Sequence, residues 1–230
     1  MKRLRAFLPL LVLAALGLGV LASGVLERFD PQRLMQEEAL WRDGVAAHPW
    51  LAALAQVGAM TLAIATGVPG AIVIVFAGGM LFGTLAGTAL SATGTLIGAT
   101  ILFFASRRAF ERGGSGEPAL AAKLRSGYLA HPTSYTLFLR LVPLFPFGAT
   151  TVALAWLRCP LWLFLAASAF GGSVMIAFES ALGAGLMETL AHEGKASLSL
   201  LAHPRILWPA LGMAALALLP IAFGWLRHRR

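Results

Sequence analysis

The chain has 230 residues, of which 58% are apolar and only 12% are charged. This composition excludes an ordinary soluble domain and is typical of a membrane protein, with room for roughly four to six spans of about 20 residues. A single cysteine, Cys159, excludes an intrachain disulfide framework and a cysteine-based metal site.

The net charge of +8 is distributed as a membrane topology requires. Basic residues precede the first apolar run, fill a central loop and follow the last apolar run: Lys2, Arg3 and Arg5, then Arg107, Arg108, Arg112, Lys123 and Arg125, then Arg227, Arg229 and Arg230. By the positive-inside rule all three groups belong in the cytoplasm, and with them both termini. No basic patch alternates with aromatic residues, so we predict no nucleic-acid partner.

The N-terminal segment, residues 1–26, is predicted to be a transmembrane helix, because the stretch from Ala6 to Leu26 carries no charge and is long enough to span a bilayer. A cleaved secretory signal is the alternative. Residues 27–50 are predicted to form an amphipathic segment on the outer face, with a helix that begins near Asp30-Pro31. A solvated connecting helix is the other interpretation of this segment.

The longest uncharged run extends from Gly44 to Ser106. It begins outside and ends inside, so it must cross the membrane an odd number of times. Three full spans would leave almost no residues for turns, whereas one re-entrant hairpin and one transmembrane helix fit well. We therefore predict this pair of elements for residues 51–106, with the hairpin interrupted at Gly67-Val68-Pro69-Gly70.

A cytoplasmic basic loop is predicted at residues 107–133, and its Gly113–Gly116 stretch is a linker rather than a phosphate loop. Residues 134–187 are predicted to repeat the hairpin and the transmembrane helix. Their centre is FLRLVPLFPFG, residues 138–148, where two prolines break the helix beside an arginine. Irregular backbone at membrane depth is tolerated where protein or a water-filled cavity surrounds it, so we expect a polar cavity here.

The two halves are related by a constant offset, which places Val68-Pro69 on Val142-Pro143 and Gly98 on Gly172. The charges give the halves opposite orientations, which indicates an inverted repeat with a substrate site near the membrane midplane. Residues 188–205 are predicted to be an outer loop. The chain then ends in a transmembrane helix and a basic tail, residues 206–230. The predicted fold is thus all-α, an inverted repeat of two re-entrant helical hairpins, each followed by a transmembrane helix, with flanking N- and C-terminal transmembrane helices.

Two stretches, residues 77–108 and residues 138–148, together resemble the VTT-domain family of the DedA superfamily, also called SNARE-associated Golgi proteins. The resemblance implies a polytopic protein that moves lipids or lipid-linked carriers across the bilayer, as a scramblase or a proton-coupled flippase. It also implies that Arg140, Pro143 and Pro146 form the second hairpin motif. The chain departs from relatives that handle undecaprenyl phosphate: Pro146 replaces a second arginine, Gly148 replaces a common asparagine, and Gly171-Gly172-Ser173 replaces a Gly-x-x-Pro pattern.

Arg140 and Glu179 are the charges predicted to lie well inside membrane-embedded segments, where ionisable residues are functional candidates. Our hypothesis is that Arg140, with Pro143 and Pro146, binds a lipid phosphate. Glu179 would pair with Arg140 in the empty state or take up a coupled proton. A purely structural pair, or a Glu179 that extends to the outer interface, is the alternative. The glycines assigned to hairpin turns and helix packing are Gly67, Gly70, Gly78, Gly79, Gly83, Gly87, Gly94, Gly98, Gly148, Gly171 and Gly172.

We predict no catalytic residue, no metal site, no cofactor and no enzymatic activity, since His192-Glu193 lacks the second histidine of a zinc helix. The predicted function is transport of a phospholipid or lipid-linked phosphate through a cavity between the hairpins. The alternatives are transport of a small solute or ion, and a non-transporting assembly or stress-tolerance factor. Membrane lipids are the predicted partners, and whether the protein forms a homo-oligomer is left open. The strong excess of arginine over lysine suggests a location in a bacterial inner membrane.

Overall fold

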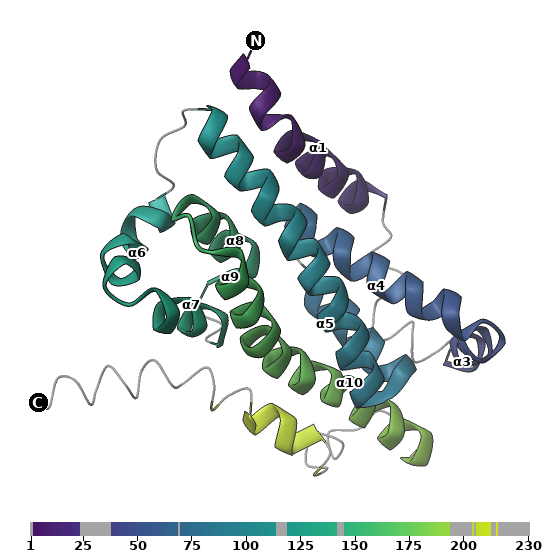
Figure 1. The fold of residues 1–230 in the computed structure, drawn as a ribbon. Coiled ribbons are helices and arrows are strands. Elements are labelled where there is room, and N and C mark those ends of the chain that lie inside the picture. The colour runs from purple at the N-terminus through teal and green to yellow at the C-terminus, as the bar shows by residue number, and fades with distance from the viewer. Residues whose placement is uncertain are drawn as a thin grey trace, which may run out of the picture.

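The computed structural model describes residues 2–23, 38–68, 70–113, 119–141, 145–193 and 206–212, with the single positions 204 and 215. In this part of the chain the regular elements are helices, and none is a strand. The predicted all-α architecture is therefore confirmed. In chain order the elements are α1 (Lys2–Ala22), α3 (Glu38–Ala47), α4 (Pro49–Thr66), α5 (Ala71–Gly113), α6 (Ala119–Ala130), α7 (Pro132–Leu141), α8 (Phe147–Trp156), α9 (Leu161–Ala167), the π-helical turn η2 (Ser168–Gly172) and α10 (Ser173–Glu193) (Figure 1).

Helix α5 consists of two limbs, a first limb of residues 71–82 and a second limb of residues 84–113, joined at Gly83. Gly83 has φ 78° and ψ 175°. A residue with a Cβ is strained in this conformation, whereas glycine adopts it freely. The glycine therefore lets one helix end and the next begin without an intervening loop.

The two limbs of α5 lie side by side and run antiparallel. The side chain of Gln56 donates from Nε2 to the carbonyl oxygen of Ile74 in the first limb and to Ser91 Oγ in the second, both at 3.0 Å. A straight helix would separate Ile74 and Ser91 by about 25 Å. The limbs also approach closely, because a Cβ placed on Gly87 would lie 2.7 Å from the carbonyl oxygen of Gly78.

Helix α4 and the first limb of α5 form the first hairpin, whose turn includes Gly67 and Gly70. Helix α4 also runs parallel to the second limb. Thr61 Oγ1 donates to the carbonyl oxygen of Gly94 at 3.2 Å, and one turn further a Cβ on Gly98 would lie 3.0 Å from Ile64 Cβ. The tip of the first hairpin therefore lies beside the middle of the second limb, about 20 Å short of that limb's far end.

Helices α7 and α8 form the second hairpin, and Pro146 stands in the N-cap position of α8. The helix break that the prolines predict is present. Helix α8 runs antiparallel to the helix that follows it: a Cβ on Gly172 would lie 3.8 Å from the Phe147 ring, while Trp156 is separated from Leu161 by a tight turn. Both halves thus share one order of elements, namely helix, turn, antiparallel helix, tight reversal and long helix.

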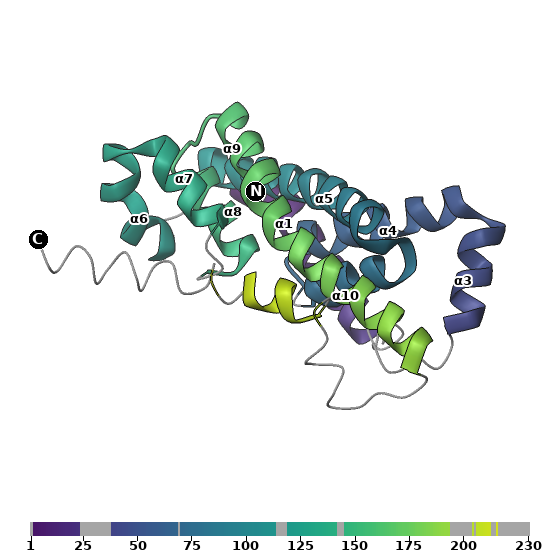
Figure 2. The same ribbon diagram turned by 90° about the horizontal axis from the view of Figure 1, so that it is seen from below.

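The tips of the two hairpins meet. A Cβ placed on Gly148, in the first turn of α8, would lie 3.8 Å from the Cα of Gly67. The hairpins reach this point from opposite ends of the bundle, since α3, which precedes the first, and α6, which precedes the second, lie at opposite ends in both views (Figure 1 and Figure 2). Opposed hairpins are the arrangement of an inverted repeat. That each tip stops inside the bilayer, as a re-entrant topology requires, stays a prediction.

The described helices have the surface of a membrane protein. Three described helical segments are long and apolar enough to cross a bilayer, Pro49–Thr66, Ala71–Glu111 and Leu161–Glu188. Large apolar side chains point outward from them: Trp50, Leu85 and Phe170 are between 77% and 87% exposed. Buried positions meanwhile hold an arginine, a glutamine, four threonines and four serines. A lipid solvent favours apolar side chains outside and polar groups paired inside, so the chain is an integral membrane protein.

Helices occupy parts of the chain that the sequence assigned to loops. Helix α6 lies within the predicted loop at 107–133, the second limb of α5 continues to Gly113, and α10 continues to Glu193. Most of the predicted last span, residues 206–230, lies outside the described residues. The segment boundaries themselves stay predictions.

Substitution of Gly79 by alanine is expected to destabilise the protein, because a Cβ there would collide with the backbone of Ser180 on α10. Overpacking of this kind costs about 1–3 kcal/mol. Gly58→Ala in α4 is the matched control, because nothing lies within 4 Å of its Cβ position and alanine stabilises a helix by about 0.5–1 kcal/mol over glycine. Thermal unfolding in detergent measures both variants. Equal melting temperatures would show that α5 and α10 do not pack this closely.

Candidate functional site

A cavity of about 480 Å³ lies where the hairpin tips meet. Its wall comes from α4, both limbs of α5, the second hairpin and α10. The lining is mostly apolar and consists of Met60, Ile64, Ala71, Ile72, Val75, Thr95, Leu139, Arg140, Leu141, Phe145, Pro146, Phe147, Gly172, Met175, Ile176 and Glu179. The structure therefore brings both predicted membrane-embedded charges, Arg140 and Glu179, to one cavity.

Arg140 lies in the last turn of α7, and its side chain folds back onto the first turn of α8. The residue is 5% exposed. Nη1 donates to Thr150 Oγ1 at 3.1 Å and to the carbonyl oxygen of Phe147 at 3.4 Å, and Nη2 donates to Thr151 Oγ1 at 3.0 Å. Both threonine hydroxyls are oriented by their own hydrogen bonds to the Phe147 carbonyl, at 2.9 Å each. These acceptors are neutral, so the guanidinium is solvated by α8 without being neutralised.

Two aromatic rings and a glycine complete the surroundings of Arg140. Its Cζ lies 4.0 Å from the ring centroid of Phe147 and 4.9 Å from that of Phe164, distances at which cation–π attraction operates. Helix α7 comes this close to η2 because Gly171 has no side chain. A Cβ on Gly171 would lie only 2.7 Å from Arg140 Cβ. π-helical turns are frequent at functional sites. In this protein the turn separates α9 from the part of α10 that carries Glu179 to the cavity wall.

Several polar groups on the cavity wall have no partner in the part of the chain that the structure describes. Arg140 Nε and Thr95 Oγ1 are buried without a hydrogen bond. Glu179 is half-buried, and no ion pair joins it to Arg140 within the part of the chain that the structure describes; the hydrogen bonds of the guanidinium go to α8. Buried polar atoms without partners are costly. A ligand that offers acceptors to Arg140 would recover part of that cost.

The other predicted site residues fall into three groups. Pro146 lines the cavity, whereas Pro143 lies outside the described residues. Gly67, Gly70 and Gly83 have positive φ at turns, and Gly148 stands against Gly67 at the meeting of the tips. The glycines at close approaches between helices are Gly78, Gly79, Gly87, Gly94, Gly98 and Gly171, and Gly172 lies on the cavity wall.

The two threonines that accept hydrogen bonds from Arg140 were not predicted from the sequence. Thr150 and Thr151 stand ten and eleven positions after Arg140, on the far side of a helix break, and no helical spacing relates them to it. Gln56 was also not predicted to have a role, although it stands out in the sequence as the one amide side chain in the uncharged run from Gly44 to Ser106. Its bonds to Ile74 and Ser91 show that it holds the first hairpin to the second limb of α5 and does not face the cavity.

The fold and the site together define an integral membrane protein in which two opposed helical hairpins enclose a cavity with a buried cation. A comparison with protein families agrees: the model of the VTT domain matches residues 68–185, just over half of the chain. The protein belongs to the VTT-domain family, which confirms the resemblance drawn from residues 77–108 and 138–148. The match begins at the tip of the first hairpin and ends in α10, so it includes Arg140, Glu179 and most of the cavity wall.

No curated protein and no solved structure is similar enough to this chain to count as a match. Within the described ranges, no group of three or more histidine, cysteine, aspartate or glutamate side chains could hold a metal ion.

Thr151→Val is expected to destabilise the protein by about 1–3 kcal/mol, because it leaves a buried N–H of Arg140 without an acceptor. Thr93→Val is the matched control, because Thr93 is exposed and its hydroxyl bonds only to the Ala89 carbonyl of its own helix, at 2.7 Å. Its effect should stay within about 0.5 kcal/mol. Chemical unfolding in detergent compares the two. Equal losses would argue against a structural hydrogen bond between Arg140 and α8.

Proposed function

We propose that this protein moves a phospholipid or a lipid-linked phosphate across the bilayer, as a scramblase or a proton-coupled flippase. The cavity between the hairpin tips receives the phosphate group, and Arg140 binds it. Membership of the VTT-domain family, whose members are generally of membrane-transporter type, supports transport over enzymatic chemistry. The proposed activity makes and breaks no covalent bond.

The observation that carries this proposal is the charge of Arg140, which has no counter-ion among the residues that the structure describes. Its guanidinium is buried, and its hydrogen bonds go to two hydroxyls and a carbonyl. A buried cation without a counter-ion is costly, and a phosphate offers anionic oxygens in the geometry that a guanidinium fork matches. Arg140 Nε has no hydrogen-bond partner among the described residues, so at least one N–H remains for the ligand.

The rest of the cavity suits an amphipathic ligand. Apolar side chains make up most of its wall, and one of them, Ile72, is 53% exposed. A lipid can therefore place its phosphate at Arg140 while its chains follow the apolar wall toward the surrounding bilayer. A small inorganic ion would use only the charged end of a cavity of about 480 Å³.

The proposal includes a location in a bacterial inner membrane with both termini in the cytoplasm. Its support is the distribution of arginine and lysine along the chain, read by the positive-inside rule. Under this orientation the first hairpin enters from the outer face and the second from the cytoplasm.

Arg140→Gln is expected to reduce translocation of a fluorescent lipid phosphate in proteoliposomes by at least about tenfold, because a charge-assisted hydrogen bond contributes about 1.5–3 kcal/mol. Arg140→Lys keeps the charge but loses the planar fork, so its rate should be intermediate. Lys123→Gln, which removes one exposed charge on α6, is the control and should match the wild type.

Melting temperatures of the same preparations separate loss of function from loss of fold. A wild-type rate in correctly folded Arg140→Gln protein would contradict the proposed phosphate site. No transport by the wild type with any lipid phosphate would instead favour the non-transporting assembly factor.

Glu179→Gln is expected to remove any acceleration of transport by an imposed proton gradient, because a glutamine cannot take up or release the coupled proton. Glu179 lines the cavity that holds Arg140 and has the position for such a role. Passive exchange and binding of the anionic lipid should persist in the variant. Transport measured with and without a pH difference across the vesicle membrane tests this, and a wild type that ignores the gradient would contradict proton coupling.

A further inference from the structure

A second cluster of arginines lies away from the Arg140 cavity, around the turn that joins α8 to α9. Arg107 on α5, Arg125 on α6 and Arg158 in the turn line a pocket of about 310 Å³ together with Glu111 and Trp156. We call it the basic pocket. Among the described residues of its lining, the charged side chains are three guanidinium groups and one carboxylate, and neither Arg140 nor Glu179 is one of them.

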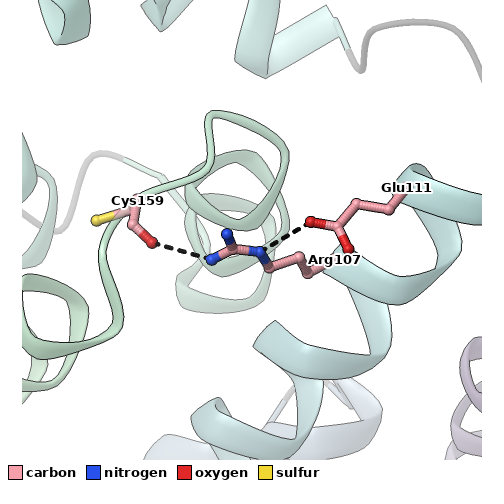
Figure 3. Close-up of polar contacts among 3 residues, drawn as sticks. All are labelled: Arg107, Glu111 and Cys159. Atoms are coloured by element: carbon pink, nitrogen blue, oxygen red, sulfur yellow. Dashed lines mark hydrogen bonds and ion pairs between the residues drawn. The ribbon is translucent and has the colours of Figure 1, made fainter.

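Hydrogen bonds fix Arg107 in the wall of the basic pocket. Its Nε donates to Glu111 Oε1 at 3.1 Å, one helical turn along α5, and its Nη1 reaches the carbonyl oxygen of Cys159 at 3.5 Å (Figure 3). The guanidinium of Arg125 lies 5.8 Å from the ring centroid of Trp156. Two arginines are therefore oriented by protein contacts, and guanidinium groups outnumber carboxylates among the described lining residues.

An apolar groove adjoins the basic pocket at Arg107 and Glu111. It runs between α1 and the second limb of α5, with a volume of about 880 Å³, and Arg107 and Glu111 line it as well as the pocket. Leu8 and Val12 on α1 and Phe104 on α5 are among its apolar walls. Figure 1 shows α1 lying alongside the C-terminal end of α5.

We propose that an anionic phospholipid binds here, with its phosphate in the basic pocket and an acyl chain in the adjoining groove. Phosphate oxygens pair with several guanidinium groups at once, and the excess positive charge selects an anionic headgroup over a zwitterionic one. By the positive-inside rule this end of the bundle faces the cytoplasm, so the lipid comes from the cytoplasmic leaflet. The site is separate from the Arg140 cavity and does not depend on transport through it.

Arg158 provides a sharp test because its backbone has φ 56°, the one positive φ outside glycine among the described residues. Arg158→Gly removes a charge from the basic pocket and at the same time suits the left-handed conformation, so the protein should fold at least as stably as the wild type. Loss of lipid binding in this variant then cannot be ascribed to unfolding. Arg158→Lys keeps the charge, and Lys123→Gln removes a nearby charge that does not line the pocket.

Binding of phosphatidylglycerol, phosphatidylcholine and inorganic phosphate to the full chain in detergent is measured by native mass spectrometry. We expect phosphatidylglycerol to bind in preference to the other two, and Arg158→Gly to weaken its binding about fivefold, as one interfacial charge does. Arg158→Lys and Lys123→Gln should stay within about twofold of the wild type. Unchanged phosphatidylglycerol binding in Arg158→Gly would overturn the proposal, and so would equal binding of phosphatidylcholine or tighter binding of inorganic phosphate.

The difference between the wild type and Arg158→Gly reports on the basic pocket alone, because Arg158 does not line the cavity that contains Arg140. A failed transport assay with Arg140 variants would therefore leave this result standing. Loss of binding in Arg158→Gly would equally leave the transport proposal untouched.

Discussion

A full positive charge buried in a membrane protein is the constraint on which the second half of this structure depends. Arg140 cannot be left among apolar groups, and the chain meets its needs by breaking a helix beside it. The break turns α8 back so that Thr150, Thr151 and the Phe147 carbonyl reach the guanidinium. Proline at the start of α8 removes a donor where a helix has no use for one. The irregular backbone and the buried charge are thus two parts of one arrangement.

The structure also depends on close approach between helix backbones, which glycine permits because it has no side chain. The first limb of α5 touches α10 at Gly79, and η2 touches α7 at Gly171. Apolar side chains gain little by leaving lipid for protein, so helices in a membrane associate through tight packing and hydrogen bonds. These contacts join the first hairpin to α10 and η2 to the second hairpin, and the cavity lies where α4, both limbs of α5, the second hairpin, η2 and α10 meet.

Much of this fold could be predicted from the sequence, because its strongest signals are local. The uncharged run from Gly44 to Ser106, the proline interruptions in each half and three basic clusters give the membrane class, the hairpins and the opposed halves. The cavity could be predicted from a charge beside two prolines. The reversal of α5 at a single residue was not predicted, because a glycine that packs and a glycine that turns look alike in a sequence. The extent of α6 and of the long helices was also missed, since charge marks the membrane edge and not the helix end.

The sequence by itself determined that this is an all-α membrane protein, and it predicted Arg140 and Glu179 as charges within membrane-embedded segments. It did so because composition, charge asymmetry and proline positions act over short stretches of chain. Only the tertiary structure decided what these charges contact: α8 folds two threonines onto Arg140, and Glu179 faces the same cavity without pairing with it. Only the fold, likewise, joins Arg107, Arg125 and Arg158 in one pocket. Contacts between residues that are far apart in the chain depend on how helices turn and pack, and no local pattern records that.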